Sequence, residues 1–247
     1  MTRRANIGFD RRIDLEWLDA AAAQAVAGTR AEDMRVHLWA LLDGVVRGER
    51  ANSARGKTVT VLNHIWGAVP SAAEPLRQRA IGQFAASKDE ERLALHWAMM
   101  IGTYPLFTDV VAATGRLLTL QGDFTLAHLT RRLVGTWGER STLERAAQRI
   151  VRSMVQWGVV QDTRTRGMYE GVQRKRRIGA AVGTVLIEAL LVDAEEASLP
   201  FDQLIGHPAL FPFSIELNAG QIRSAPQFTV HRQGLDSDFV ELRGAQN

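Results

Sequence analysis

The fold is decided by residues 123–172, which read DFTLAHLTRRLVGTWGERSTLERAAQRIVRSMVQWGVVQDTRTRGMYEGV. The second half of this stretch carries an apolar stripe with the three-and-four spacing of a buried helix face. The stripe consists of Leu143, Ala146, Ala147, Ile150, Val151, Met154 and Trp157. At about 100° per residue, a polar stripe lies on the opposite side of the same helix. It consists of Thr142, Arg145, Arg149, Arg152 and Gln156.

Both ends of this helix carry sequence signals. Ser141 followed by Glu144 is typical of a capping box, which predicts that the helix begins at Thr142. Gly158 follows the last apolar residue and supplies the left-handed conformation that ends many helices. The sequence therefore predicts a helix over 142–157.

The flanking segments complete a recognisable pattern. Upstream, Thr125 is the expected cap of a partner helix that ends at Gly138. Its apolar stripe consists of Leu126, Leu129, Leu133 and Trp137, and a further apolar helix is expected after Pro105. Downstream, residues 159–161 and 168–172 read as two strands around a turn. We interpret 102–177 as a winged helix-turn-helix.

Positive charge is concentrated in the predicted wing. Residues 164–177 contain six basic residues and only one acidic residue, Glu170. The basic residues are Arg164, Arg166, Arg174, Lys175, Arg176 and Arg177. Arginine side chains reach phosphate oxygens and guanine edges, and glutamine and threonine suit adenine or backbone contacts. We therefore expect a binder of double-stranded DNA, with the polar stripe in the major groove and the wing on the phosphates.

Two other readings of these residues stay open. Winged modules also act as protein adaptors, and an arginine stripe opposite a core stripe is often only a solvated helix face. The chain could therefore be a scaffold subunit that docks a larger methyltransferase or ATPase, or it could bind structured RNA. Salt separates DNA binding from the scaffold alternative, because phosphate binding weakens steeply with salt and apolar docking does not.

The rest of the chain predicts a mainly α protein in three parts. Residues 1–101 read as a helical bundle with Trp17, Trp39, Trp66 and Trp97 in its packing. Residues 178–247 read as an apolar helix, interrupted only by Glu188, and a small, mostly β appendage. That helix needs a partner surface, either on the winged module or on another subunit. Strands are expected at 213–217, 227–231 and 239–242.

Three local expectations concern the bundle. A helix over 31–46 should bury Met34, Leu38, Leu41, Leu42 and Val45. Residues 47–57 should form an exposed basic loop, with the next helix beginning near Thr58. Ser87 with Glu90 is a second predicted capping box.

Composition and motif searches argue against catalysis. The 247 residues carry a net charge of +3 and no cysteine, so disulfides and thiolate metal sites are excluded. The histidines lack metal-site spacing, and Gly56-Lys57-Thr58 lacks both the first glycine and the preceding strand of a phosphate loop. We expect a cytoplasmic protein without enzyme activity, metal or cofactor, although a hydrolase site assembled from distant residues would leave no local pattern.

Residues 104–162 also resemble a known family. The segments YPLFTDVV, GDFTLAHLTRRL and ERSTLERAAQRIVRSMVQWGVV are similar to the middle of the BrxA-type proteins of bacteriophage-exclusion systems. Those are small helical proteins with a winged-helix portion, held to bind DNA and encoded beside a methyltransferase and an ATPase. The resemblance implies an accessory or regulatory subunit in anti-phage defence. The proline-bearing tail after Ser198 has no counterpart in it.

Overall fold

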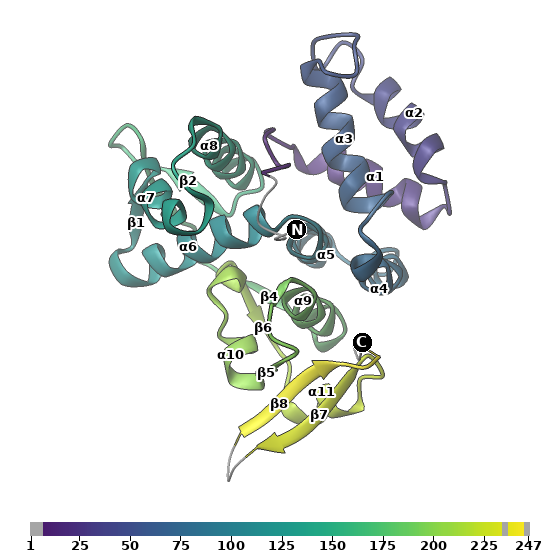
Figure 1. Cartoon of the computed structure of the whole chain (residues 1–247), viewed down its shortest axis with the longest axis vertical. Coiled ribbons are helices and arrows are strands. Elements are labelled where there is room, and N and C mark those ends of the chain that lie inside the picture. The colour runs from purple at the N-terminus through teal and green to yellow at the C-terminus, as the bar shows by residue number, and fades with distance from the viewer. Residues whose placement is uncertain (1–6, 234–236, 245–247) are drawn as a thin grey trace.

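The computed structural model describes residues 7–233 and 237–244, and the chain is mainly helical with small sheets mostly in its C-terminal part (Figure 1). The first helices are α1 Leu15–Val26, α2 Ala31–Leu41, α3 Ala54–Trp66, α4 Glu74–Phe84 and α5 Asp89–Thr103. The middle holds α6 Pro105–Gln121, β1 Asp123–Thr125, α7 Leu126–Trp137, α8 Ser141–Gln156, β2 Val160–Asp162 and β3 Met168–Gly171. The remainder holds β4 Arg176–Ile178, α9 Ala180–Asp193, β5 Ser198–Pro200, α10 Phe201–Ile205, β6 Phe213–Ile215, α11 Ala219–Ser224, β7 Phe228–Gln233 and β8 Ser237–Leu242. In the part described, no helix is long and apolar enough to cross a membrane.

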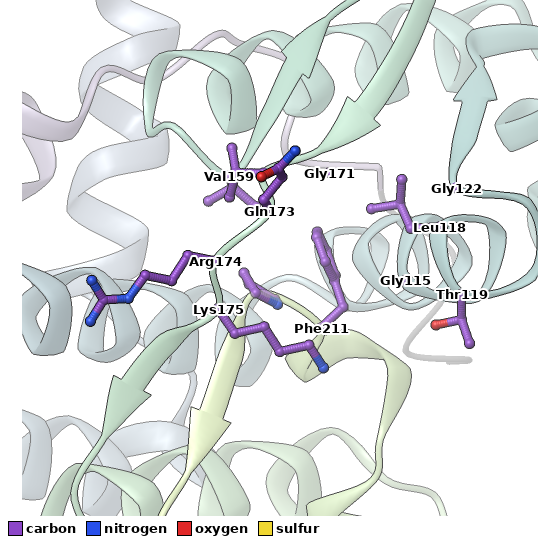
Figure 2. Close-up of a pocket in the computed structure, with 12 residues that line it drawn as sticks. Gly115, Leu118, Thr119, Gly122, Val159, Gly171, Gln173, Arg174, Lys175 and Phe211 are labelled. Carbon is purple, nitrogen blue, oxygen red and sulfur yellow. The ribbon is translucent and has the colours of Figure 1, made fainter.

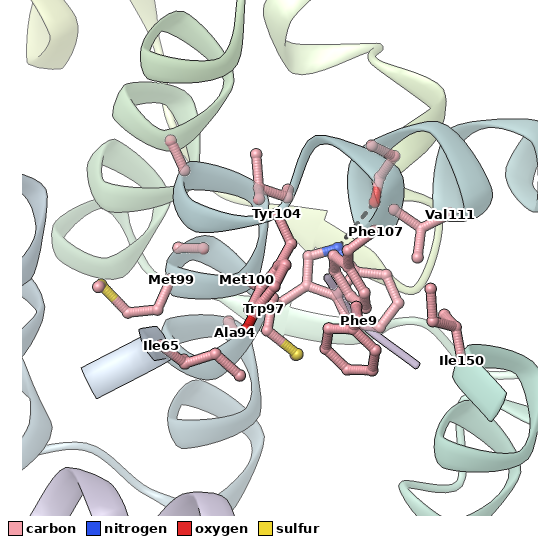
Figure 3. Packing of buried hydrophobic residues seen from close by; sticks show 14 of the residues in the cluster. Phe9, Ile65, Ala94, Trp97, Met99, Met100, Tyr104, Phe107, Val111 and Ile150 are labelled. Atoms are coloured by element: carbon pink, nitrogen blue, oxygen red, sulfur yellow. Dashed lines mark hydrogen bonds between the residues drawn. The ribbon is translucent and has the colours of Figure 1, made fainter. Parts of the chain in front are cut away.

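Helix α5 lies at the centre and packs against α3, α4, α6 and α9 (Figure 1). Every residue of α5 from Leu93 to Thr103 is buried. Trp97 connects the parts of the chain, since its ring centroid lies 5.0 Å from that of Phe107 and 6.1 Å from that of Trp157. Its indole Nε1 donates to the carbonyl of Ala209 at 2.9 Å (Figure 3). One continuous apolar core therefore runs through the three predicted parts.

The stretch 105–171 folds as helix, strand, two helices and a hairpin. Its three-stranded antiparallel sheet has the order β1-β3-β2, with Phe124 opposite Tyr169 and Val160 opposite Gly171. The predicted helices 126–137 and 142–157 are confirmed to within a residue. The Thr125 hydroxyl accepts from the backbone N–H of His128, which confirms the predicted cap of α7.

Both predicted helix ends at glycine are confirmed, because Gly138 and Gly158 have φ of 73° and 63°. Both predicted capping boxes are wrong. Helix α8 begins at Ser141 itself, and Arg140 at its N-cap makes no side-chain capping bond. The Ser87 hydroxyl donates back to the carbonyl of Gln83 at the end of α4 and leaves Lys88 at the N-cap of α5. A serine in a Ser-x-x-Glu pattern can lie before the helix, inside its first turn or at the end of the preceding helix. The pattern alone therefore did not determine where α5 and α8 begin.

The connector between α2 and α3 differs from its prediction. Helix α2 ends at Leu41, and Leu41 and Val45 are 44% and 62% exposed rather than buried. Helix α3 begins at Ala54, and Arg55 turns inward to donate to Asp43 at 2.7 Å and to the Trp39 carbonyl at 2.9 Å. Arg55 thereby satisfies carbonyl and carboxylate groups at the end of α2, which a solvated loop would leave to water.

The apolar helix α9 has its main partner surface on the helical bundle, which the sequence did not suggest. It packs against α5 and α4 of the bundle (Figure 1). Its Glu188 is 1% exposed and accepts two bonds from Arg79 of α4, at 2.6 and 2.7 Å. A buried carboxylate needs such a partner, and the bidentate guanidinium supplies it.

The C-terminal part confirms the three expected strands and adds helices to them. Strand β6 pairs in parallel with β4, and β7 and β8 form a hairpin joined by β5. The short helices α10 and α11 were not predicted, because five and six residues are too few to show a period.

A hydrogen-bonded chain, buried at Trp66 and His96 and partly exposed at Asp19, connects α1, α3 and α5. Trp66 Nε1 donates to His96 Nδ1 at 3.0 Å, and His96 Nε2 lies 3.1 Å from the Asp19 carboxylate. The indole N–H of Trp66 can only donate, so His96 Nδ1 accepts this bond and carries no proton. The ring proton therefore lies on Nε2, and the imidazole is neutral. Burial lowers the pKa of His96, and burial also lowers the pKa of His207 to about 4.

We expect stability to fall as the pH is lowered from about 6.5 towards 4, because unfolded histidines take up protons there while His96 and His207 stay neutral in the folded state. The expected loss is about 1–3 kcal/mol, measured as the urea midpoint at several pH values. His96→Gln should be less stable at neutral pH and less sensitive to acid. A wild-type midpoint that does not change over this range would contradict the protonation account.

Candidate nucleic-acid interface

The polar side of α8 is exposed at its N-terminal half. Leu143, Ala147 and Ile150 are buried against the core, which turns Thr142, Arg145 and Arg149 outward. Neither arginine forms an ion pair with any residue that the structure describes. The predicted stripe is therefore available for a ligand over this half of the helix.

The β2–β3 hairpin brings two more cations beside α8. Asp162, the last residue of β2, accepts two bonds of 2.8 Å from Arg152 of α8. The turn 163–167 begins at the next residue, and its Arg164 and Arg166 are exposed and unpaired among the described residues. We call Arg145, Arg149, Arg164 and Arg166 the cationic face. An ion pair between Arg152 and Asp162 thus links the start of this turn to the polar side of the helix.

Two predicted contacts on α8 are already engaged within the chain. The bonds to Asp162 raise the pKa of Arg152, so Arg152 stays protonated and its charge is paired with a carboxylate of the chain. The side-chain oxygen of Gln156 accepts from the backbone N–H of Leu15 at 2.9 Å. Nearby, Ser153 Oγ accepts from Ile13 N, and Trp157 Nε1 donates to the Ile13 carbonyl. The segment before α1 therefore covers the C-terminal end of α8.

The predicted cluster 174–177 is divided by the structure. Arg176 turns inward and donates to the carbonyls of Trp157 and Gly158 at 3.0 Å, where it satisfies the end of α8. Arg177 pairs with Glu216. Arg174 and Lys175 line a pocket beside α6 (Figure 2) and do not join the cationic face.

Sequence reasoning missed Arg131 and Arg132. Both are exposed on α7, whose Leu129 and Leu133 are buried. The same periodicity that marked the apolar stripe of α7 would have identified them. They extend the basic surface around the helix that precedes the turn.

Charge is distributed unevenly along the chain. Residues 105–177 contain thirteen Lys and Arg against six Asp and Glu, a net charge of +7, so the remainder carries −4. Positive potential is therefore concentrated on the part that holds the cationic face. Among the described residues, no group of His, Asp and Glu could hold a metal ion.

Comparison of the chain with protein-family models, curated proteins and solved structures gave no match.

Proposed function

We propose that residues 105–171 form a winged helix-turn-helix that binds double-stranded DNA. Helix α8 enters the major groove with Thr142, Arg145 and Arg149, and the turn 163–167 rests on the backbone as the wing. The proposal rests on one observation above all, the exposed cationic face, whose guanidinium groups have no carboxylate partner among the described residues. The order helix, strand, helix, helix and hairpin, with the sheet order β1-β3-β2, supports it.

Arg152 and Gln156 have a different role in this proposal from the one expected of them. Arg152 positions the hairpin through Asp162, and Gln156 anchors the segment before α1. The groove-facing residues are then those of the first half of α8. The resemblance to BrxA-type proteins and a place in anti-phage defence stay predictions, and the DNA proposal does not depend on them.

The wing gives a prediction of its own. Arg164→Ala with Arg166→Ala should weaken duplex binding by about tenfold for any sequence and reduce the slope of log K against log salt by about 2, because two phosphate contacts are lost. Fluorescence anisotropy with two unrelated duplexes measures both quantities. Arg223→Ala, in α11, removes a cation paired with Asp238 and should leave binding unchanged. A loss confined to one of the two duplexes would show that the wing reads bases.

A scaffold function is the second candidate, and one observation favours it. Val36 is 70% and Val45 is 62% exposed, together with Leu41, at the outer helix α2 and just after it. Exposed apolar side chains of this kind suit a protein partner such as a methyltransferase or ATPase subunit. The apolar segment 178–192, by contrast, packs against α4 and α5 of the same chain, which cover it.

Gel-shift titrations with duplex DNA, single-stranded DNA and a structured RNA at two salt concentrations test the proposal. We expect the duplex to be retained best, and retention to fall about tenfold or more between 50 and 200 mM salt. Preferential retention of the RNA probe would show that the ligand is RNA and not DNA. Absence of any shift at low salt would leave the scaffold function.

A further inference from the structure

The pocket beside α6 combines an apolar wall with two cations that have no carboxylate partner among the described residues. It has a volume of about 330 Å³, near the lower end of the range for small-molecule sites. Residues from α6, the end of β3, the segment 172–175 and the Phe211–Pro212 turn surround it. Leu118, Val159 and Phe211 supply its apolar surface (Figure 2).

The charged side chains that line this pocket are all positive. Its twelve lining residues include Arg174 and Lys175 and no Asp or Glu. Neither cation pairs with a carboxylate anywhere in the described residues. Figure 2 shows the Lys175 side chain running past Phe211 and the Arg174 side chain directed away, so Lys175 is the cation placed to meet a ligand. Thr119 and Gln173 add hydrogen-bonding groups.

The pocket walls are fixed by close packing. A Cβ on Gly115 would lie 2.1 Å from the carbonyl oxygen of Pro208, and one on Gly171 would lie 3.3 Å from Leu118. Glycine at 115 therefore lets the chain before Phe211 approach α6, and glycine at 171 leaves the space in front of Leu118 open. The next residue after the pocket segment, Arg176, is bonded to the end of α8. These contacts make a preformed cavity.

We propose that this pocket binds a small organic anion with a flat apolar body, such as an aromatic phosphate or carboxylate, and that Lys175 binds its charged group. The ring would lie against Phe211 and Leu118, where apolar contact favours it, and the anion would lie at the open side. Lys175 then serves this ligand and not the DNA backbone. Ligand binding does not depend on the proposed DNA function, and only the DNA comparison below rests on it.

Calorimetric titration of the full chain with phenyl phosphate tests the proposal. We expect saturable one-to-one binding, with inorganic phosphate and benzyl alcohol each about tenfold weaker or more, because each lacks one half of the recognised chemistry. Lys175→Gln should weaken binding about tenfold, whereas Arg177→Gln, its neighbour paired with Glu216, should not. Thr119→Trp should obstruct the pocket, and Leu120→Trp, one residue along α6 and 71% exposed, should not.

DNA binding by the same variants separates this inference from the proposed function. Lys175→Gln should lose phenyl phosphate and keep duplex affinity within about twofold, while Arg145→Ala with Arg149→Ala should show the opposite. No saturable binding of phenyl phosphate, equal binding of inorganic phosphate, or binding unaffected by both Lys175→Gln and Thr119→Trp would overturn the pocket assignment. A wild-type chain that binds phenyl phosphate and no duplex would overturn the proposed function and leave the pocket standing.

Discussion

Replacing Arg145 and Arg149 together by alanine is expected to lower the affinity for duplex DNA about a hundredfold or more at physiological salt. Both side chains are exposed on the polar side of the N-terminal half of α8, opposite its buried apolar side. Each arginine contact to a base edge contributes about 1–3 kcal/mol, so losing two removes most of the specific binding. Anisotropy titration of a labelled duplex measures the change.

Folding should be almost unaffected in that double variant, because exposed side chains without partners contribute little to stability. The matched control is Arg35→Ala with Lys88→Ala, which makes the same change in net charge at exposed positions of α2 and before α5. The control should bind duplex DNA within about twofold of the wild type. Equal affinity of the two double variants would show that α8 has no special role and that only net charge matters.

Arg79→Ala is expected to cost about 3 kcal/mol or more of folding free energy, because it leaves the Glu188 carboxylate without its guanidinium. Glu188 is 1% exposed within the most apolar helix of the chain, so water replaces Arg79 poorly. For a chain of this size the loss corresponds to a fall in Tm of about 6–12 °C. Thermal unfolding followed by circular dichroism measures it.

The double replacement Arg79→Leu with Glu188→Leu distinguishes a buried charge from a general packing defect. Removing both partners should restore stability to within about 1–2 kcal/mol of the wild type, since no charge is left without a partner. Arg30→Ala breaks the exposed pair with Asp33 and should cost less than about 1 kcal/mol. A double variant no more stable than Arg79→Ala would show that the pair itself stabilises the contact between α4 and α9.

The elements of the DNA-binding proposal could be predicted because each has a short-range signal. Helices α7 and α8 each bury one face and expose the other, so their periodicity gives both the helix and the direction of its core. Gly138 and Gly158 end them because a residue at positive φ is needed there. These signals depend on neighbours within a few residues, which the sequence displays directly.

The availability of the site residues could not be predicted, because it depends on partners far along the chain. Gln156 bonds to Leu15, Arg177 pairs with Glu216, and Arg176 reaches back to Trp157. Only the folded chain brings these groups together. Of the six basic residues between 164 and 177, Arg176 and Arg177 contact other groups of the chain, and the other four have no carboxylate partner among the described residues. The same reason applies to α9, which is apolar on all sides and therefore carries no periodicity to indicate its partner.

The chain lacks cysteine, so a single introduced cysteine can carry a photo-crosslinker at a chosen position. The central claim is that α8 and the turn 163–167 contact the duplex, and Gln148→Cys and Thr165→Cys place the reagent at exposed positions on each. Val36→Cys places it on α2, away from both. We predict crosslinks to duplex DNA from positions 148 and 165 and none from position 36. Crosslinks from position 36 without any from 148 and 165 would contradict the account.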